Sequence, residues 1–526
     1  MDKKLLLIIS LYLVLQAFSF HELGIVGEVA MGWGETPDVW SEIDPVVWGN
    51  AANSPSSGSV WGPFIANETR PQEQLRLGSY TLPLAMNQYT GGVWDWPSRI
   101  VYSIYPSPMA VRIFHILLGG VFIGWIAWLF KRERQNIVAY GCALVLATDW
   151  SFTFYKQALG GTEIALQVAI AGLLWVVLYR KSLFYFLLFL GVGFHAKFPF
   201  LFAVLPLLFW MLIFKRWPSK DGFQKGLLAF LVLLSPLLIS WIHHGQLNGH
   251  IRSHDTFSMQ WKRVQAAFSF SSQASIRENS SNLLLWLGAP MQFYEQIYDL
   301  KPQAWLGSWI RLPTLALLSL VVPFFRRNND LVFCTAVLIS QLLLIAVAAK
   351  DMHHFAMVLP VFAVTLGLLL QSLWTYKPWL ILCVLPITLA SSSDMLRSDA
   401  TFSQILVPTF RSHDQRALQE LLRSHNVERL ITMDYEIYGL IEHIAPEIES
   451  IHAWGVISHK RKRALAGILS EANGGHLIVL MPSMPMIYNL RPSGVQLQKE
   501  GKELGLRVTE IDSWDDRLWL YRVDTL

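Results

Sequence analysis

Long apolar segments separated by short polar loops fill the first three quarters of the chain. A helix that crosses a bilayer needs about 20 mainly apolar residues, or somewhat fewer where flanking side chains reach the headgroups. About eleven segments qualify, of which 136–150 and 182–194 are short. We predict membrane spans near 4–20, 109–130, 136–150, 162–179, 182–194, 197–214, 224–243, 308–325, 331–349, 355–374 and 378–391.

The first of these segments has two interpretations. MDKKLLLIISLYLVLQAFSF has two lysines before an apolar core, as a signal peptide does. No small-residue cleavage site of the A-x-A type follows it. We therefore interpret it as an uncleaved first span.

Basic residues predict the orientation of the spans, because cytoplasmic loops of membrane proteins are enriched in lysine and arginine. The basic segments are Lys3-Lys4, 131–134, Arg180-Lys181, Lys215-Arg216, Arg326-Arg327 and Lys377. With the predicted spans they all fall on one side of the membrane, and we predict that this side is cytoplasmic. The opposite side then receives residues 21–108, 244–307, 350–354 and everything after about 392. We therefore predict a protein of an inner or plasma membrane whose N-terminus is cytoplasmic.

The pattern changes at about Ser392, where charged and apolar residues become mixed. Residues 427–434 and 474–482 look like buried strands, and 411–425 looks like an amphipathic helix. LRVTEID and RLWLYRV favour a terminal hairpin. The predicted fold is a polytopic α-helical membrane protein (residues 1–391) with a C-terminal extracytoplasmic α/β domain (392–526). No G-x-G-x-x-G is present, so a dinucleotide site is not supported.

Composition supports the membrane assignment and excludes several other classes. Of 526 residues, 53% are hydrophobic and 15% charged, and the mean hydropathy is +0.37, unlike an ordinary soluble domain. A net charge of +4 does not suggest a nucleic-acid-binding protein. The three cysteines lie in apolar segments, so we expect no disulfide framework.

Cations occur where an apolar span should tolerate none. In GVGFHAKFPFLFAVLPLLFW, His195 and Lys197 interrupt an apolar run, and an ammonium in hydrocarbon costs several kcal/mol. Lys197 either extends to the outer headgroups or faces an anionic ligand such as a lipid phosphate. Arg112, at the outer end of the span 109–130, has the same two interpretations.

The first outer loop carries a cluster of carboxylates above the membrane surface. It begins at His21 and holds six acids: Glu22, Glu28, Glu35, Asp38, Glu42 and Asp44. One of them is a candidate general base for an acceptor hydroxyl or amine, although each also fits an ordinary solvated loop. Residues 93–105 predict a helix in the interface plane. Trp40, Trp48, Trp61, Trp94 and Trp96 either stack on sugar faces or anchor at the interface.

Two further polar segments lie at the predicted outer ends of spans. TDWSFTFYKQALGGTE contributes Lys156 and Glu163, and AAKDMHHFAMVLP contributes His353 and His354 as lining of an outer cavity. A divalent metal there is only weakly indicated, because adjacent histidines point to different faces of a helix. A transporter would place polar groups near the midplane and show repeats. Neither is visible, which favours an enzyme acting on a lipid-borne substrate.

The order of these segments resembles the GT-C superfamily of integral-membrane glycosyltransferases. The similar branch is family 39, with protein O-mannosyltransferases and aminoarabinose transferases. The matching segments, in order, are LPLAMNQYTGGVWDWPSRIVYSIYPSPMAVRIFHILLGG, TDWSFTFYKQALGGTEIALQ, GVGFHAKFPF, DMHHFAMVLPVF and MDYEIYG. Each is short and degenerate, so their order and the topology carry the resemblance.

The resemblance implies transfer of a sugar from a polyprenyl-phosphate donor to an extracytoplasmic acceptor, with inversion. It places Lys197 and Arg112 near the lipid phosphate, and Lys156 and His195 are further candidates for that site. A carboxylate of the first outer loop takes the base role, where we favour Glu28 over Glu22, Asp38 and Asp44. The chain departs from the family in having glutamates first where an aspartate is usual, and Lys156 and Ala158 where relatives carry arginine and aspartate.

Other functions remain open at this point. A transporter or flippase of a lipid-linked glycan is the main alternative, and a catalytically inactive scaffold is another. The sequence does not distinguish the sugar, nor whether the acceptor is a glycan, a lipid or a protein. We expect the lipid bilayer and the lipid-linked donor as partners, and no nucleic acid.

Overall fold

The computed structural model describes two compact units, which we treat separately. The helical unit comprises Met1–His21, Gln88–Tyr294 and Pro302–Asp399, and the second unit comprises Glu22–Asn87, Glu295–Lys301 and Ala400–Leu526. Within them, the described residues are 2–18, 74–77, 80–83, 85–87, 90–91, 93–105, 108–149, 152, 161–197, 200–248, 317–318, 320–322, 324–325, 328–348, 357–379, 382, 385–402, 412–432, 445, 447–452, 466, 469–470, 472–480, 494–514 and 518–526.

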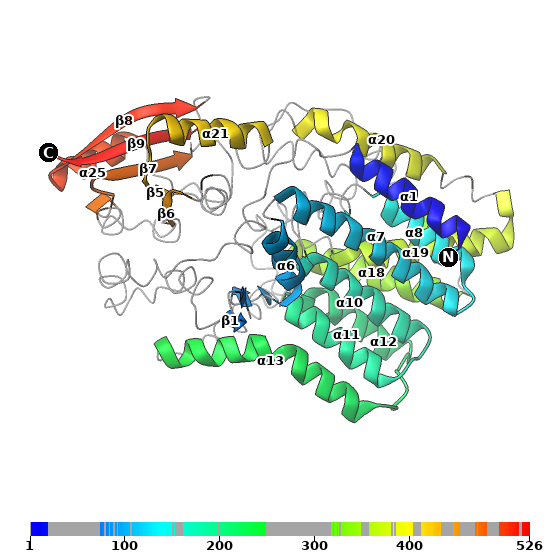
Figure 1. Cartoon of the computed structure of the whole chain (residues 1–526). Coiled ribbons are helices and arrows are strands. Elements are labelled where there is room, and N and C mark those ends of the chain that lie inside the picture. Colours follow the sequence, from blue (N-terminus) through cyan, green and yellow to red (C-terminus); the bar gives the residue numbers. More distant parts are fainter. Residues whose placement is uncertain are drawn as a thin grey trace. The chain divides into compact units, whose positions relative to one another are not determined.

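Apolar helices packed side by side form the helical unit (Figure 1). Its described elements are α1 (Lys3–Ala17), β4 (Thr90–Gly91), η4 (Val93–Asp95), α6 (Trp96–Ile104), α7 (Pro108–Arg132), α8 (Asn136–Ala147), α10 (Gly161–Leu178), α11 (Leu183–Ala196), α12 (Leu201–Ile213), α13 (Phe223–Asn248), α18 (Asn329–Ala348), α19 (Leu359–Tyr376) and α20 (Leu385–Phe402).

Nearly every predicted span coincides with one of these helices. By length and composition, two described helices are long and apolar enough to cross a membrane, Arg112–Arg132 and Leu359–Tyr376, and six shorter ones are also apolar. The last span was predicted wrongly: its helix is Leu385–Phe402 rather than 378–391. Pro386 falls in its first turn, where a missing N–H costs nothing. Most of the predicted span 308–325 lies outside the described residues.

Small residues let the helices approach closely. A Cβ built on Gly367 of α19 would lie 2.9 Å from the Val138 carbonyl oxygen and 3.0 Å from Cys142 Sγ, both on α8. Cys142 donates its thiol hydrogen to the Ala363 carbonyl at 3.3 Å. Contacts of this kind are typical of helices packed in a membrane. The hydrophobic effect does not drive association there, and small residues let the backbones approach closely enough for van der Waals packing.

The outward faces of these helices are apolar. Along α7, large exposed side chains recur at helical spacing, at Ile113, Leu117, Val121 and Trp128. Exposed leucines, valine and isoleucine also line α13. A soluble protein rarely exposes contiguous apolar surface of this extent. We therefore infer that these helix faces contact lipid.

Ion pairs join the helices at the end of the bundle that carries the basic loops, which we call the basic end. Lys131 Nζ lies 2.6 Å from Asp2 Oδ2 and joins the end of α7 to the start of α1. The other described pairs there are Lys181–Glu133 at 2.7 Å and Arg216–Asp330 at 2.6 Å. The predicted gathering of the described basic loops at one end is therefore confirmed. Arg326 and Arg327 lie outside the described residues.

A mixed five-stranded sheet forms the centre of the second unit. Its strand order is β6 (Glu449–His452), β5 (Arg429–Thr432), β7 (Gly475–Leu480), β9 (Leu518–Thr525) and β8 (Leu506–Trp514). β5 pairs in parallel with both β6 and β7. β9 pairs antiparallel with both β7 and β8. The predicted strands, the terminal hairpin and the helix α21 (Ser412–Ser424) are all present. The unit also contains α25 (Gly494–Glu503), the antiparallel pair β1 (Gln74–Leu77) and β2 (Tyr80–Pro83), and β3 (Ala85–Asn87).

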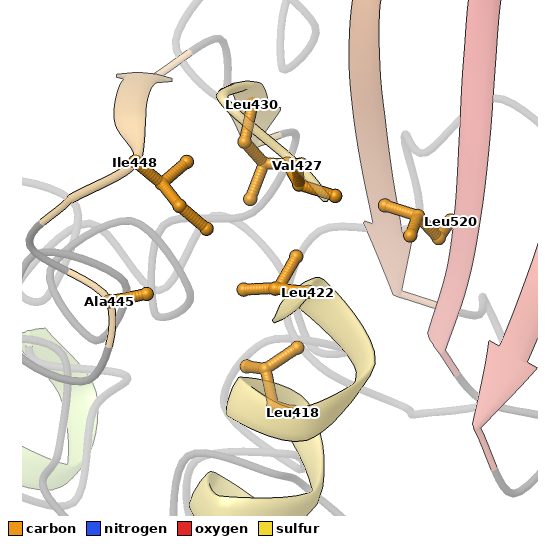
Figure 2. Packing of buried hydrophobic residues seen from close by; sticks show 7 residues of the cluster. All are labelled: Leu418, Leu422, Val427, Leu430, Ala445, Ile448 and Leu520. Carbon is orange, nitrogen blue, oxygen red and sulfur yellow. The ribbon is translucent and has the colours of Figure 1, made fainter. Parts of the chain in front are cut away.

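Helix α21 packs on this sheet through a buried aliphatic cluster (Figure 2). Leu418 and Leu422 of the helix meet Leu430 of β5 and Leu520 of β9, and all four are at most 1% exposed. At the rim, His425 Nε2 lies 2.8 Å from Asp512 Oδ2. That hydrogen bond holds the pKa of the Asp512 carboxyl below its ordinary value.

Candidate active site

Several charged and polar residues of the helical unit gather at the end opposite the basic end, which we call the site end. It is formed by the starts of α7, α10 and α12 and the ends of α8 and α11. The short segment η4 packs against α10 there. Helices that alternate in direction thus bring together residues distant in the sequence.

A buried ion pair lies at the site end. Lys197 Nζ lies 2.7 Å from Glu163 Oε1, and their side chains are 8% and 1% exposed. Glu163 belongs to the first turn of α10, and Lys197 caps the end of α11. The pairing partly offsets the cost of burying either charge. Among the described residues, no partner meets the second carboxylate oxygen, Oε2.

The backbone around Lys197 is set by a glycine and a phenylalanine. The Lys197 N–H donates to the Gly193 carbonyl at 3.1 Å, and Lys197 then adopts an extended conformation with φ −153°. The Phe200 N–H donates to the Lys197 carbonyl at 2.9 Å. A Cβ on Gly193 would lie only 2.2 Å from Phe200 Cζ. The glycine therefore permits the tight passage from α11 to α12.

His195 and Trp94 add buried polar atoms beside the ion pair. His195 is 1% exposed, and its ring centroid lies 5.9 Å from that of Trp94 in η4. Within the described part of the chain, neither nitrogen of the His195 ring has a hydrogen-bond partner, and nor does Trp94 Nε1. Buried polar atoms in native proteins are nearly always hydrogen-bonded, so such a group needs an explanation.

A second buried contact fixes the segment that carries Trp94. Ser98 Oγ of α6 lies 2.7 Å from His115 Nε2 of α7, and both side chains are buried. η4 and α6 together cover residues 93–104, which confirms the helix predicted over 93–105. The Ser98–His115 contact holds this helix against α7.

Two more charged residues lie at the site end. Arg112 is half-buried in the second turn of α7, three residues before His115. Asp149 follows α8 and is 4% exposed, and its Oδ1 accepts a hydrogen bond from the Phe152 N–H at 3.0 Å. The structure thus places Arg112, Lys197 and His195 at one end of the bundle, as expected.

The remaining predicted site residues lie outside the described residues. These are the base candidates Glu22, Glu28, Asp38 and Asp44, and the cavity residues Lys156, His353 and His354. In the part of the chain that the structure describes, no group of three or more His, Cys, Asp and Glu side chains is arranged to hold a metal ion.

The pairing of Glu163 with Lys197 does not follow from the sequence pattern. Glu163 was assigned only to a polar outer turn, and Trp94 was placed among the tryptophans that stack or anchor. The available signal was a carboxylate at the start of one apolar span and a lysine at the end of a later one. Opposite charges at the same end of two neighbouring apolar helices are expected to pair, because an unpaired buried charge is costly.

Comparison with known proteins identifies the fold. No family model and no curated protein matches the sequence. Two solved structures of ArnT from Cupriavidus metallidurans are similar, one bound to undecaprenyl phosphate and one in the apo state. In each case the identity is 10%, the TM-score is 0.55, and the match covers 98% of this chain and 97% of ArnT. At 10% identity the similarity shows a shared fold, and it supports the predicted polytopic helical membrane architecture.

Proposed function

We propose that this protein is a membrane glycosyltransferase that moves a sugar from a polyprenyl-phosphate donor to an extracytoplasmic acceptor. The observation that carries this proposal is the fold that the chain shares, over nearly its whole length, with ArnT bound to undecaprenyl phosphate. A fold alone does not define an activity, so the residues of the site end must supply the rest of the argument.

The cations of the site end suit a lipid phosphate. Arg112 presents a guanidinium in the first two turns of α7, and Lys197 presents an ammonium at the end of α11. The Lys197 ammonium donates a hydrogen bond to Glu163 Oε1 at 2.7 Å. We assign Arg112 and Lys197 to the phosphate, with Lys156 as a further candidate. Cations there stabilise the negative charge that grows on the phosphate as the sugar leaves.

A carboxylate of the first outer loop completes the proposed reaction. An acceptor hydroxyl or amine attacks the anomeric carbon, and the carboxylate takes the proton that the acceptor loses. The bond between the anomeric carbon and the phosphate oxygen breaks, and the lipid phosphate leaves with the electron pair. A single displacement of this kind inverts the anomeric configuration. Glu28 is the favoured base, with Glu22, Asp38 and Asp44 as alternatives.

The two ends of the bundle support an orientation for this reaction. Basic residues gather at the basic end, and cytoplasmic ends of membrane proteins are enriched in lysine and arginine. We therefore place the basic end in the cytoplasm and the site end on the extracytoplasmic side of an inner or plasma membrane. The donor's phosphate group then meets the site at the outer interface.

The proposal is tested by release of undecaprenyl phosphate from sugar-bearing donors. Purified wild type in nanodiscs receives undecaprenyl phosphate carrying radiolabelled glucose, mannose or 4-amino-4-deoxyarabinose, together with glycan, lipid and protein acceptors whose hydroxyl or amine takes the sugar. We expect release from at least one donor. Arg112→Ala and Lys197→Ala should slow it by about 100-fold or more, the usual effect of removing one charge-stabilising group. Glu28→Gln should slow it by about 100-fold to 10,000-fold.

Matched variants at the basic end serve as controls. Arg132→Ala removes an exposed arginine at the other end of α7, whose guanidinium lies 5.6 Å from the Trp128 ring. Lys181→Ala removes the lysine of the Glu133 ion pair. Both should retain near-wild-type rates. Equal losses in the control variants and in Arg112→Ala would contradict the assignment of the phosphate site, and no release by wild type would contradict the proposed activity.

A further inference from the structure

Four buried polar atoms of the site end have no partner within the described part of the chain. They are Glu163 Oε2, Trp94 Nε1 and the two ring nitrogens of His195. The Glu163 and His195 side chains are each about 1% exposed. Leaving one such atom unpaired inside a protein is unfavourable, so four of them close together indicate a place where a polar ligand binds.

The four atoms belong to one neighbourhood. Glu163 is joined to Lys197, which follows His195 by two residues at the end of α11. The His195 ring contacts the Trp94 ring, and η4, which carries Trp94, packs against α10, which carries Glu163. The contacts thus lead from Glu163 through Lys197, His195 and Trp94 back to α10.

The chemistry of these atoms determines the class of ligand. An ionised carboxylate oxygen only accepts hydrogen bonds, and an indole N–H only donates. A neutral imidazole offers one donor and one acceptor. Together they require a ligand that both donates and accepts at several adjacent positions. Neighbouring hydroxyl groups on a ring have this property, because each hydroxyl donates once and accepts twice.

A phosphate does not fit the same atoms. Its oxygens are acceptors at neutral pH and would meet Glu163 Oε2, which is also an acceptor and carries negative charge. Glu163 also neutralises part of the charge of Lys197, with Nζ and Oε1 only 2.7 Å apart. The atoms around Glu163 therefore favour a neutral hydroxylated group over a second anion.

We propose that Glu163, His195 and Trp94 bind the hydroxylated sugar ring of the lipid-linked donor, next to the phosphate that Lys197 and Arg112 face. The inference rests on the proposed function and specifies where that site distinguishes a sugar-bearing lipid from the bare lipid phosphate. His195, which the sequence analysis grouped with the phosphate residues, then acts on the sugar. Lys197 lies between the two parts of the ligand.

The test compares the binding of two kinds of lipid to the full-length protein in nanodiscs. One is undecaprenyl phosphate, and the other is undecaprenyl phosphate carrying glucose, mannose or 4-amino-4-deoxyarabinose. Wild type should bind at least one sugar-bearing lipid about tenfold or more tightly than the bare lipid, a difference of about 1.4 kcal/mol. Trp94→Phe, His195→Leu and Glu163→Gln should each remove most of this advantage. Trp94→Phe and His195→Leu should change the affinity for undecaprenyl phosphate by less than about twofold, whereas Glu163→Gln should raise it, because Lys197 loses the carboxylate that partly neutralises it.

A stability measurement accompanies the binding test. Trp94→Phe and His195→Leu remove polar atoms that have no described partner, so the ligand-free variants should unfold at the wild-type temperature or above it. Matched controls are Trp210→Phe, whose indole N–H donates to Ser340 Oγ at 2.8 Å, and Glu133→Gln, whose carboxylate pairs with Lys181. Both controls should keep the sugar advantage.

Three results would overturn the inference. If the variants weaken undecaprenyl phosphate and the sugar-bearing lipids equally, the three residues belong to the phosphate site. The residues hold water or serve packing alone if no sugar-bearing lipid binds wild type more tightly than undecaprenyl phosphate. The same conclusion follows if the variants still bind the sugar-bearing lipid more tightly by the wild-type factor. If wild type binds neither kind of lipid, the proposed function itself fails, which is a distinguishable outcome.

Discussion

At the scale of single residues, Lys197 shows how an apolar helix end accommodates a charge. Its ammonium has a carboxylate partner on the neighbouring helix, and both side chains are almost fully buried. A buried pair of this kind often stabilises a protein no more than apolar residues of similar size would. The pair is therefore weak evidence for a role in stability, and we expect it to serve the reaction.

The two contributions separate in a double-variant experiment. Lys197→Met leaves the Glu163 carboxylate buried without its cation and should destabilise the protein by about 3–5 kcal/mol. Glu163→Leu combined with Lys197→Met removes both charges and should recover most of that loss, since apolar residues of similar volume replace buried pairs well. Thermal unfolding in detergent measures the stability, and release of undecaprenyl phosphate measures the activity.

The activity of the double variant decides what the pair does. A protein that regains its stability yet releases no undecaprenyl phosphate shows that the charges are needed for the reaction. A double variant as active as wild type would mean that the pair serves only the fold. Full stability of Lys197→Met alone would contradict the ion pair itself.

At the scale of elements, the turn between α11 and α12 sets where Lys197 lies. Gly193 faces the Phe200 ring so closely that no side chain fits between them, and the ring also packs edge-on against Phe194 with centroids 5.4 Å apart. Gly191, two residues earlier on α11, lies against α13. A Cβ built on Gly191 would lie 3.2 Å from Phe230 Cα. The two glycines thus serve different contacts, one at the turn and one between helices.

Replacing Gly193 should displace this turn. Gly193→Ala forces Phe200 to move and should cost about 1–3 kcal/mol, as overpacking usually does, and should slow release of undecaprenyl phosphate because Lys197 shifts. Gly124→Ala is the matched control: its Cβ would lie 3.6 Å from Ile9 Cδ1, an ordinary contact, and alanine favours a helix by about 1 kcal/mol.

A compensating change makes the Gly193 result specific. Phe200→Leu in the Gly193→Ala background removes the ring that the new methyl group meets and should restore part of the stability. Thermal unfolding and the release assay are measured on all four proteins. A Gly193→Ala protein that matches Gly124→Ala in both measurements would show that the turn tolerates a side chain and that its geometry is wrongly described.

The elements show what the sequence could and could not predict. Runs of apolar residues predicted the helices, 427–434 and 474–482 predicted the buried strands β5 and β7, and LRVTEID and RLWLYRV predicted the hairpin of β8 and β9, because these patterns are local. The Glu163–Lys197 pair is not local: it depends on which faces of α10 and α11 meet. Helices that are apolar all round carry no pattern that identifies the packed face. The short strand β6 (Glu449–His452) was missed for a similar reason, since four residues show too little alternation.

At the scale of the helical unit, the bundle has two chemically different ends. The basic end is linked by ion pairs such as Lys131 with Asp2 at 2.6 Å, whose side chains are mostly half-exposed, although Arg216 in the pair with Asp330 is buried. The site end contains the buried pair and the polar atoms of His195 and Trp94 that have no hydrogen-bond partner among the described residues. This polarity suits an enzyme that works at one membrane surface. A transporter would require the polar groups nearer the middle of the bundle.

The measurement that tests this account most directly follows a sugar-bearing lipid in proteoliposomes. Wild-type protein is reconstituted with radiolabelled glycosyl undecaprenyl phosphate, and both the release of undecaprenyl phosphate and the movement of intact glycolipid between leaflets are recorded. The account predicts release of the lipid phosphate with transfer of the sugar to an added acceptor, and no movement of intact glycolipid above that of empty liposomes. Movement of intact glycolipid between leaflets without release would contradict the account and establish a flippase.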